Sequence, residues 1–175
     1  MRESVPQTGS STVTRYLADA GATEAMGARL APALGAGLVV TLSGDLGTGK
    51  TTLVRGCLRA LGWSGPVKSP TYTLVEFYPI SSLYFYHFDF YRFEDPSEWD
   101  TAGLADYFRA DAVCLVEWPE RVTGRLPSPD LEITLVHPDD MHTTGRYLTL
   151  DARTEAGERC VAAMTRATGA APAPA

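Results

Sequence analysis

The sequence predicts an α/β fold in which a mixed β-sheet is flanked by helices and includes an antiparallel hairpin. Three observations support this prediction. An apolar run at residues 38–42 leads directly into the pattern G-x-x-x-x-G-K-T at residues 44–51, and a helix-like stretch follows. A fully apolar run at residues 112–116 ends in a glutamate, which is typical of a buried parallel strand. Two runs rich in aromatic and β-branched residues, 73–78 and 83–89, are placed to form the hairpin. The order strand, glycine loop, helix makes the sheet P-loop NTPase-like.

The elements before the hairpin follow from periodicity and capping signals. We expect a short strand at residues 13–17 and a helix from Thr23, as its N-cap, to Leu34, with Pro32 disturbing the last turn. The stretch after the glycine loop predicts a helix because its apolar residues share one face: Leu53, Val54, Cys57, Leu58 and Leu61. Residues 62–70 carry enough Gly, Pro and Ser to predict a loop.

The elements after the hairpin turn, which we place at residues 79–82, complete a single domain. Short helices are expected within residues 96–108, strands at 131–136 and 147–150, and a final helix at 155–168. We therefore predict one domain over residues 13–168. The polar and Pro/Ala-rich ends, 1–12 and 169–175, predict disordered tails.

Composition narrows the class of protein. The net charge is −6 and the pI is about 5.0, so the chain has no general field that attracts DNA or RNA. No apolar run is long enough to span a membrane, and the N-terminus has no secretory h-region, which favours a cytoplasmic location. Cys57, Cys114 and Cys160 are widely spaced and predict buried thiols rather than a disulfide or zinc site.

The glycine loop predicts binding of a nucleoside triphosphate. Glycines at 44, 47 and 49 allow the chain to curl so that backbone N–H groups point at an anion, and the next helix adds its N-terminal partial charge. Lys50 can reach the β- and γ-phosphates, and the Thr51 hydroxyl can ligate Mg²⁺.

Two carboxylates are candidates for hydrolysis. Glu117 ends an apolar strand, where α/β folds place ligand contacts, and it can hold Mg²⁺ directly or through water. Strand alternation places His87 and Asp89 on one face, where they could position water or support the metal. The alternatives are that Glu117 faces solvent, that Asp89 caps a turn or pairs with Arg92, and that His87 is a core residue.

The segment 68–73, Lys-Ser-Pro-Thr-Tyr-Thr, carries hydroxyls in a loop after the P-loop helix. Ser69, Thr71 and Thr73 could sense a γ-phosphate as switch loops do, or could form an ordinary turn.

Together these segments resemble the bacterial TsaE (YjeE) P-loop ATPases. The resemblance rests on S-G-D-L-G-T-G-K-T-T at 43–52, V-K-S-P-T-Y-T-L-V-E at 67–76, H-F-D-F-Y-R at 87–92 and C-L-V-E-W at 114–118, in order over roughly residues 20–150. It implies an ATPase required for threonylcarbamoyladenosine modification of tRNAs that read A-starting codons. It also implies that the TsaB–TsaD pair is the partner and holds the tRNA, with no membrane or DNA contact.

The resemblance further implies site roles. Lys50, Asp89 and Glu117 would be catalytic, and Thr51 with Glu117 would hold Mg²⁺. The ATP-binding set would be Thr23, Gly47, Thr48, Gly49, Lys50, Thr51, Thr52 and Arg146, and the switch set Ser69, Thr71 and Thr73.

Two other functions stay open. A small-molecule kinase needs an acceptor pocket and a lid, for which the short segment between the P-loop helix and the hairpin leaves little room. A nucleotide-gated binding module that does not hydrolyse ATP is opposed, but not excluded, by Asp89 and Glu117. A GTPase is disfavoured because the sequence has no N-K-x-D-type segment.

Overall fold

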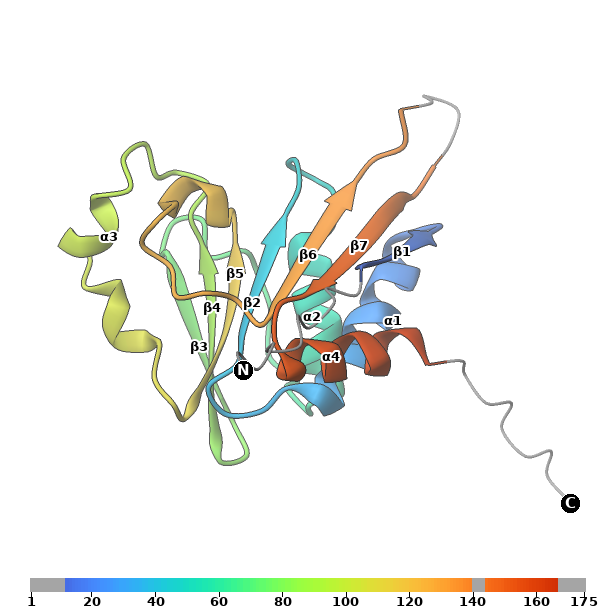
Figure 1. The fold of residues 1–175 in the computed structure, drawn as a ribbon, viewed down its shortest axis with the longest axis horizontal. Coiled ribbons are helices and arrows are strands. Elements are labelled where there is room, and N and C mark those ends of the chain that lie inside the picture. Colours follow the sequence, from blue (N-terminus) through green and yellow to red (C-terminus); the bar gives the residue numbers. More distant parts are fainter. Residues whose placement is uncertain (1–11, 140–143, 167–175) are drawn as a thin grey trace, which may run out of the picture.

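The computed structural model describes residues 12–139 and 144–166. Over this part of the chain a seven-stranded mixed sheet has the strand order β1-β7-β6-β2-β5-β4-β3 (Figure 1). The strands are β1 (Thr12–Leu17), β2 (Val39–Ser43), β3 (Val75–Ile80), β4 (Leu83–Asp89), β5 (Ala112–Glu117), β6 (Leu131–Val136) and β7 (Arg146–Ala152). The helices are α1 (Ala20–Leu30), α2 (Lys50–Ala60), α3 (Glu98–Thr101) and α4 (Glu155–Thr165), with short 3₁₀ turns η1 (Ala31–Ala33), η2 (Leu104–Tyr107) and η3 (Pro119–Val122).

The centre of the sheet is parallel and its two margins are antiparallel. Strand β2 pairs in parallel with β5 and β6, and β4 pairs in parallel with β5. Strands β3 and β4 form the predicted antiparallel hairpin, while β1, β7 and β6 form an antiparallel set at the other margin. The predicted α/β class, with a mixed sheet and a hairpin, is confirmed.

Two apolar layers cover the sheet. Strand β5 is buried along its whole length and alternates between them: Val113 and Leu115 face the layer under α1, α2 and α4. Cys114 and Val116 face a second, aromatic-rich layer beneath α3 and η2, which lie apart from the other helices in Figure 1. A strand buried on both faces reads as a continuous apolar run, which is why residues 112–116 predicted it correctly.

Some predicted boundaries were wrong. The first helix begins at Ala20 with Asp19 as its N-cap, because the Asp19 carboxylate accepts the Ala22 N–H at 2.7 Å. Thr23 is therefore inside the helix, where its hydroxyl donates to the Asp19 carbonyl oxygen at 3.0 Å. The α-helix ends at Leu30 and continues as the 3₁₀ turn that contains Pro32.

The hairpin is also shifted relative to the prediction. Strand β3 begins at Val75, since Leu74 has a left-handed φ of 67°, and Pro79 lies in the strand instead of the turn. Because β3 is an edge strand, the missing N–H of Pro79 costs no ladder bond. The last helix ends at Thr165, and the rest of the span predicted for it, like most of both predicted tails, lies outside the described residues. Among the described residues no helix is long and apolar enough to cross a membrane.

Candidate functional site

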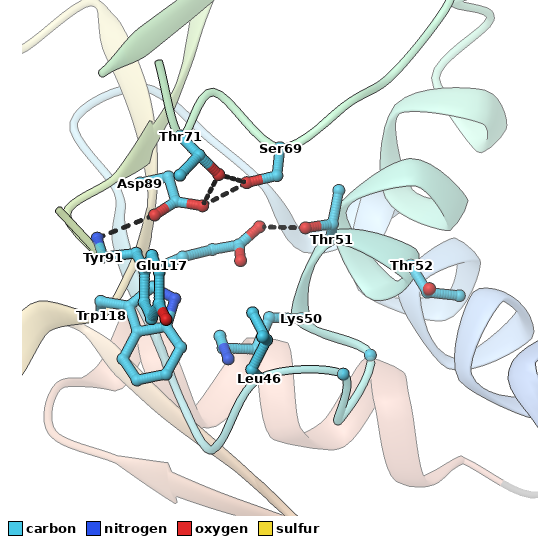
Figure 2. A pocket seen from close by; sticks show the side chains of 12 residues that line it. Leu46, Lys50, Thr51, Thr52, Ser69, Thr71, Asp89, Tyr91, Glu117 and Trp118 are labelled. Atoms are coloured by element: carbon cyan, nitrogen blue, oxygen red, sulfur yellow. Dashed lines mark hydrogen bonds between the residues drawn. The ribbon is translucent and has the colours of Figure 1, made fainter. Parts of the chain in front are cut away.

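The candidate site lies at the carboxyl edge of the central parallel strands. Strand β2 ends at Ser43 and runs into the glycine loop, while Asp89 and Glu117 are the last residues of β4 and β5 and are register partners. These ends surround a cavity of about 280 Å³ (Figure 2). It is lined by Leu46, Gly47, Gly49, Lys50, Thr51, Thr52, Ser69, Thr71, Asp89, Tyr91, Glu117 and Trp118.

The glycine loop has the backbone that its sequence requires. Gly44, Gly47 and Gly49 have φ of +136°, +83° and +106°, a region that side chains of L-residues rarely enter. Gly44 also abuts β6, where a Cβ would collide with the Leu135 carbonyl oxygen. Gly49 is the residue before α2, so the first N–H groups of that helix open toward the cavity.

Lys50 is buried and bonded to the loop itself. Its ammonium donates to the carbonyl oxygens of Gly44 and, at 2.9 Å, of Asp45, and it lies 4.1 Å from the centre of the Trp118 ring. Burial lowers the pKa of Lys50, and the negative charges of Glu117 and Asp89 oppose that shift. The positive charge therefore sits at the cavity, held by groups that a phosphate could replace.

Thr51 and Glu117 meet across the cavity. The Thr51 hydroxyl, in the first turn of α2, donates to Glu117 Oε1 at 2.8 Å. Glu117 is almost fully buried, so the alternative that it faces solvent is excluded. The same Oε1 lies 2.8 Å from Nε2 of His87, a fully buried residue of β4.

Asp89 connects the site to the segment 68–73. One of its carboxylate oxygens accepts hydrogen bonds from the Ser69 hydroxyl and, at 3.1 Å, from the Thr71 hydroxyl. The other oxygen accepts the backbone N–H of Tyr91 at 2.9 Å. The two hydroxyls are also 2.7 Å from each other. Asp89 does not pair with Arg92; the guanidinium of Arg92 stacks on Tyr72 instead.

The other residues expected at the site are more dispersed. Thr52 lines the cavity but points away from the carboxylates in Figure 2. The Thr48 hydroxyl donates to the Asp45 carbonyl within the glycine loop at 2.9 Å. Thr73 bonds Glu76 at 3.0 Å and does not line the cavity.

Thr23 and Arg146 lie together against Gly49 of the glycine loop and do not line the cavity. The Arg146 guanidinium donates to the Thr23 hydroxyl at 3.3 Å, and a Cβ on Gly49 would lie 2.8 Å from the same Arg146 nitrogen. Arg146 Nε is buried and has no partner among the described residues. Helix α1 and strand β7 thus bring two polar side chains beside the loop although they are far apart in sequence.

Two cavity residues were not singled out by the sequence analysis. Leu46 lies on the glycine loop and is 71% exposed, and Tyr91 packs against Trp118 with their ring centres 5.0 Å apart. Trp118 has a left-handed φ of 59°, which turns its ring over Lys50. For these two aromatic residues the one available signal was position. Trp118 directly follows the strand-end carboxylate Glu117, and Tyr91 lies two residues after Asp89.

The donor set fits Mg²⁺ bound together with a phosphate. A hydroxyl and a carboxylate supply hard oxygen ligands, and Mg²⁺ at phosphate sites uses few protein ligands because phosphates and water provide the others. No cluster of three or more His, Cys, Asp or Glu able to hold a metal occurs in residues 12–139 and 144–166.

Comparisons with known proteins agree with the motifs and the geometry. A Haemophilus influenzae protein named tRNA threonylcarbamoyladenosine biosynthesis protein TsaE is 46% identical over 128 residues, which cover 73% of this chain and 78% of that protein. A protein of the same name from Nostoc sp. is 37% identical over 129 residues, covering 71% of this chain and 78% of its own.

Solved structures give the same result. The crystal structure of Bacillus subtilis YdiB superposes with a TM-score of 0.75 and 29% identity, and covers 91% of this chain and 98% of its own.

The sequence profile of the family described as "Threonylcarbamoyl adenosine biosynthesis protein TsaE" matches residues 17–146, which include every element around the cavity. This chain therefore belongs to the TsaE family of threonylcarbamoyl adenosine biosynthesis proteins.

Proposed function

We propose that this protein is a Mg²⁺-dependent ATPase that serves the threonylcarbamoyladenosine modification of tRNA. Family membership supports the pathway. The observation that supports hydrolysis is that Asp89 lies in register beside Glu117, the carboxylate that accepts the 2.8 Å hydrogen bond from Thr51 on the P-loop helix. A protein that only binds nucleotide needs Thr51 and Glu117, whereas hydrolysis also needs the second carboxylate, Asp89.

Binding of the triphosphate uses the glycine loop and Lys50. The N–H groups at the start of α2 would bind the phosphates, and the Lys50 ammonium would leave the carbonyls of Gly44 and Asp45 for the β- and γ-phosphates. Thr23 and Arg146 would contact the nucleoside side of ATP, since they lie against Gly49 but outside the cavity that Asp89 and Glu117 line.

Thr51 and Glu117 would hold the metal. A hydroxyl that donates its proton to Glu117 keeps its lone pairs available for a cation, so the existing hydrogen bond need not break. When bound, Mg²⁺ would neutralise charge on the phosphate oxygens.

Asp89 would position the attacking water. Its carboxylate is at the cavity and is now satisfied by the hydroxyls of Ser69 and Thr71. We propose that these hydroxyls exchange Asp89 for the γ-phosphate, which would make segment 68–73 a switch loop and free one carboxylate oxygen for water. Thr73, bonded to Glu76, would act in this loop only after a rearrangement.

The partners would be the TsaB–TsaD pair, with the tRNA held mainly by them. The net charge of −6 supports this division, because counterion release from RNA requires many basic contacts. The proposed location is the cytoplasm, where tRNA modification substrates occur.

The test is hydrolysis of ATP by the full chain with Mg²⁺, alone and with TsaB–TsaD. We expect slow hydrolysis that the pair accelerates and that EDTA abolishes. Asp89→Asn should bind ATP with unchanged affinity but lose at least ~100-fold in kcat. Asp111→Asn, an exposed Asp paired with Arg109, makes the same charge change away from the site and should behave as wild type.

Two results would overturn the proposal. Phosphate transfer to a small acceptor would identify a kinase instead. ATP binding without hydrolysis in the presence of TsaB–TsaD would identify a nucleotide-gated binding module. Substitution of GTP for ATP serves as the control for base selectivity.

A further inference from the structure

His87 lies behind the site and has no role in the chemistry described so far. It is fully buried in β4, between β3 and β5, and does not line the cavity. Its Nε2 is 2.8 Å from Glu117 Oε1, the oxygen that also accepts the Thr51 hydroxyl. Three elements therefore converge on one carboxylate oxygen: α2, β4 and β5.

The hydrogen-bond pattern assigns the proton of the ring. Glu117 as a carboxylate can only accept, so the imidazole must donate from Nε2. Nδ1 is buried and has no partner among the described residues. Nδ1 lacks a described partner in either tautomer, but a proton on Nδ1 would also place two acceptors, Nε2 and Glu117 Oε1, against each other at 2.8 Å. The Nε2–H tautomer avoids that repulsion.

We propose that His87 is a positioning residue that acts through Glu117, an inference that rests on the proposed function of the site. Donation from both His87 and Thr51 to Oε1 fixes the plane of the carboxylate. Oε2 then has no hydrogen bond to a described residue and is turned away from Thr51 (Figure 2). That oxygen is the one left for the metal or for a water bound to it.

In this arrangement the two residues of the H-x-D pattern in β4, His87 and Asp89, act on the site from different sides. Phe85, His87 and Asp89 occupy one face of the strand, which runs from the core to the cavity. Asp89 reaches the cavity directly, whereas His87, two residues earlier, reaches the neighbouring strand-end carboxylate from inside the protein. Without His87, the several torsions of Glu117 would be restrained at the carboxylate by Thr51 alone.

The experiment compares three variants of the full chain. His87→Leu removes the donor at similar bulk, and His87→Gln returns an N–H near the position of Nε2. Phe85→Leu is the matched control, since it also truncates a buried β4 side chain on the same face, but one that does not line the cavity. For each we would measure the Mg²⁺ affinity of the complex with a non-hydrolysable ATP analogue, the affinity for the analogue without metal, and the melting temperature.

His87→Leu should weaken Mg²⁺ binding roughly 10–100-fold, as loss of an outer-shell partner typically does, while metal-free nucleotide affinity stays unchanged. His87→Gln should recover most of the loss, and Phe85→Leu should lower only the melting temperature. In a Glu117→Gln background, His87→Leu should cause no further loss, because it acts through that carboxylate. Equal Mg²⁺ affinity in His87→Leu and Phe85→Leu, or additive losses with Glu117→Gln, would overturn the inference.

A measurement on the unmodified protein needs no variant to fold. Ring ¹⁵N shifts of His87 in the nucleotide-free protein should show a proton on Nε2; a ring protonated on Nδ1 alone would refute the assignment. Failure of the wild-type chain to bind Mg²⁺ with the analogue would instead refute the proposed function. The two failures are thus distinguishable.

Discussion

The two glycines Gly44 and Gly47 differ in what an alanine would meet, and this difference yields a sharp prediction. Both have positive φ, so alanine at either position incurs backbone strain. At Gly47 nothing lies within 4 Å of an added Cβ. At Gly44 the Cβ would lie 3.1 Å from the Leu135 carbonyl carbon and collide with its oxygen, which belongs to the backbone of β6 and cannot rotate away.

The magnitudes follow from these contacts. Gly47→Ala should cost about 1–2 kcal/mol, the usual strain of one residue in the left-handed region. Gly44→Ala adds overpacking against a backbone, about 1–3 kcal/mol more, for a total of roughly 2–5 kcal/mol. At about 2–4 °C per kcal/mol for a chain of this size, Gly44→Ala should melt roughly 10 °C below wild type and Gly47→Ala about 4 °C below.

Nucleotide affinity should follow the same order. Displacement of the loop from β6 moves the carbonyls and N–H groups around Lys50, so Gly44→Ala should weaken ATP binding at least ~10-fold, whereas Gly47→Ala keeps its backbone. Calorimetric melting and ATP titration of both variants provide the assay. Equal melting temperatures for the two variants would show that the approach to β6 is not what requires glycine at 44.

Three further predictions concern individual polar groups. Lys50→Met should abolish ATP binding without lowering the melting temperature, because burial already disfavours the lysine charge; a fall of more than about 5 °C would contradict this. Ser69→Ala removes a donor to Asp89 and should lower the melting temperature by about 3–6 °C, whereas Thr73→Val, whose hydroxyl bonds exposed Glu76, should lower it by about 1 °C or less. Burial raises the pKa of Cys114 to about 12 from 9.0, so the folded thiol stays protonated while the unfolded thiol ionises, and stability falls as pH rises above 9. Urea unfolding of wild type and Cys114→Ala at pH 7 and 10 should therefore show a stability difference that shrinks by about 1.4 kcal/mol at the higher pH.

The parts of the fold that sequence predicted well are those governed by local pattern. The glycine loop, the buried strand at 112–116 and the aromatic hairpin each carry their signal within a few residues. The errors arose where the local sequence is compatible with two different element boundaries. Asp19 and Thr23 are both N-cap residue types, and only the structure shows that Asp19 accepts the helical N–H. Pro79 indicates a turn unless its strand is known to be at an edge, which is a property of the whole sheet.

The site was predictable to the extent that strand ends are predictable. Glu117 and Asp89 follow from their positions at the ends of β5 and β4. The hydrogen bond between His87 and Glu117 joins residues 30 apart, and no local pattern specifies it, so the sequence favoured a core residue at 87. The left-handed backbone of Trp118, which turns its ring over Lys50, is likewise set by packing and not by propensity.

The polar groups of the candidate site are bonded to one another, and this has an energetic consequence for the proposed binding of nucleotide. Lys50 donates to loop carbonyls, and Asp89 accepts from Ser69 and Thr71. Triphosphate binding would therefore exchange hydrogen bonds instead of adding them, and its net free energy would be smaller than the number of new contacts suggests. The bonds from Ser69 and Thr71 also hold the carboxylate that the proposed hydrolysis would use. A partner that drew segment 68–73 away from Asp89 would free that carboxylate without touching the glycine loop, so it would raise kcat more than it changed ATP affinity.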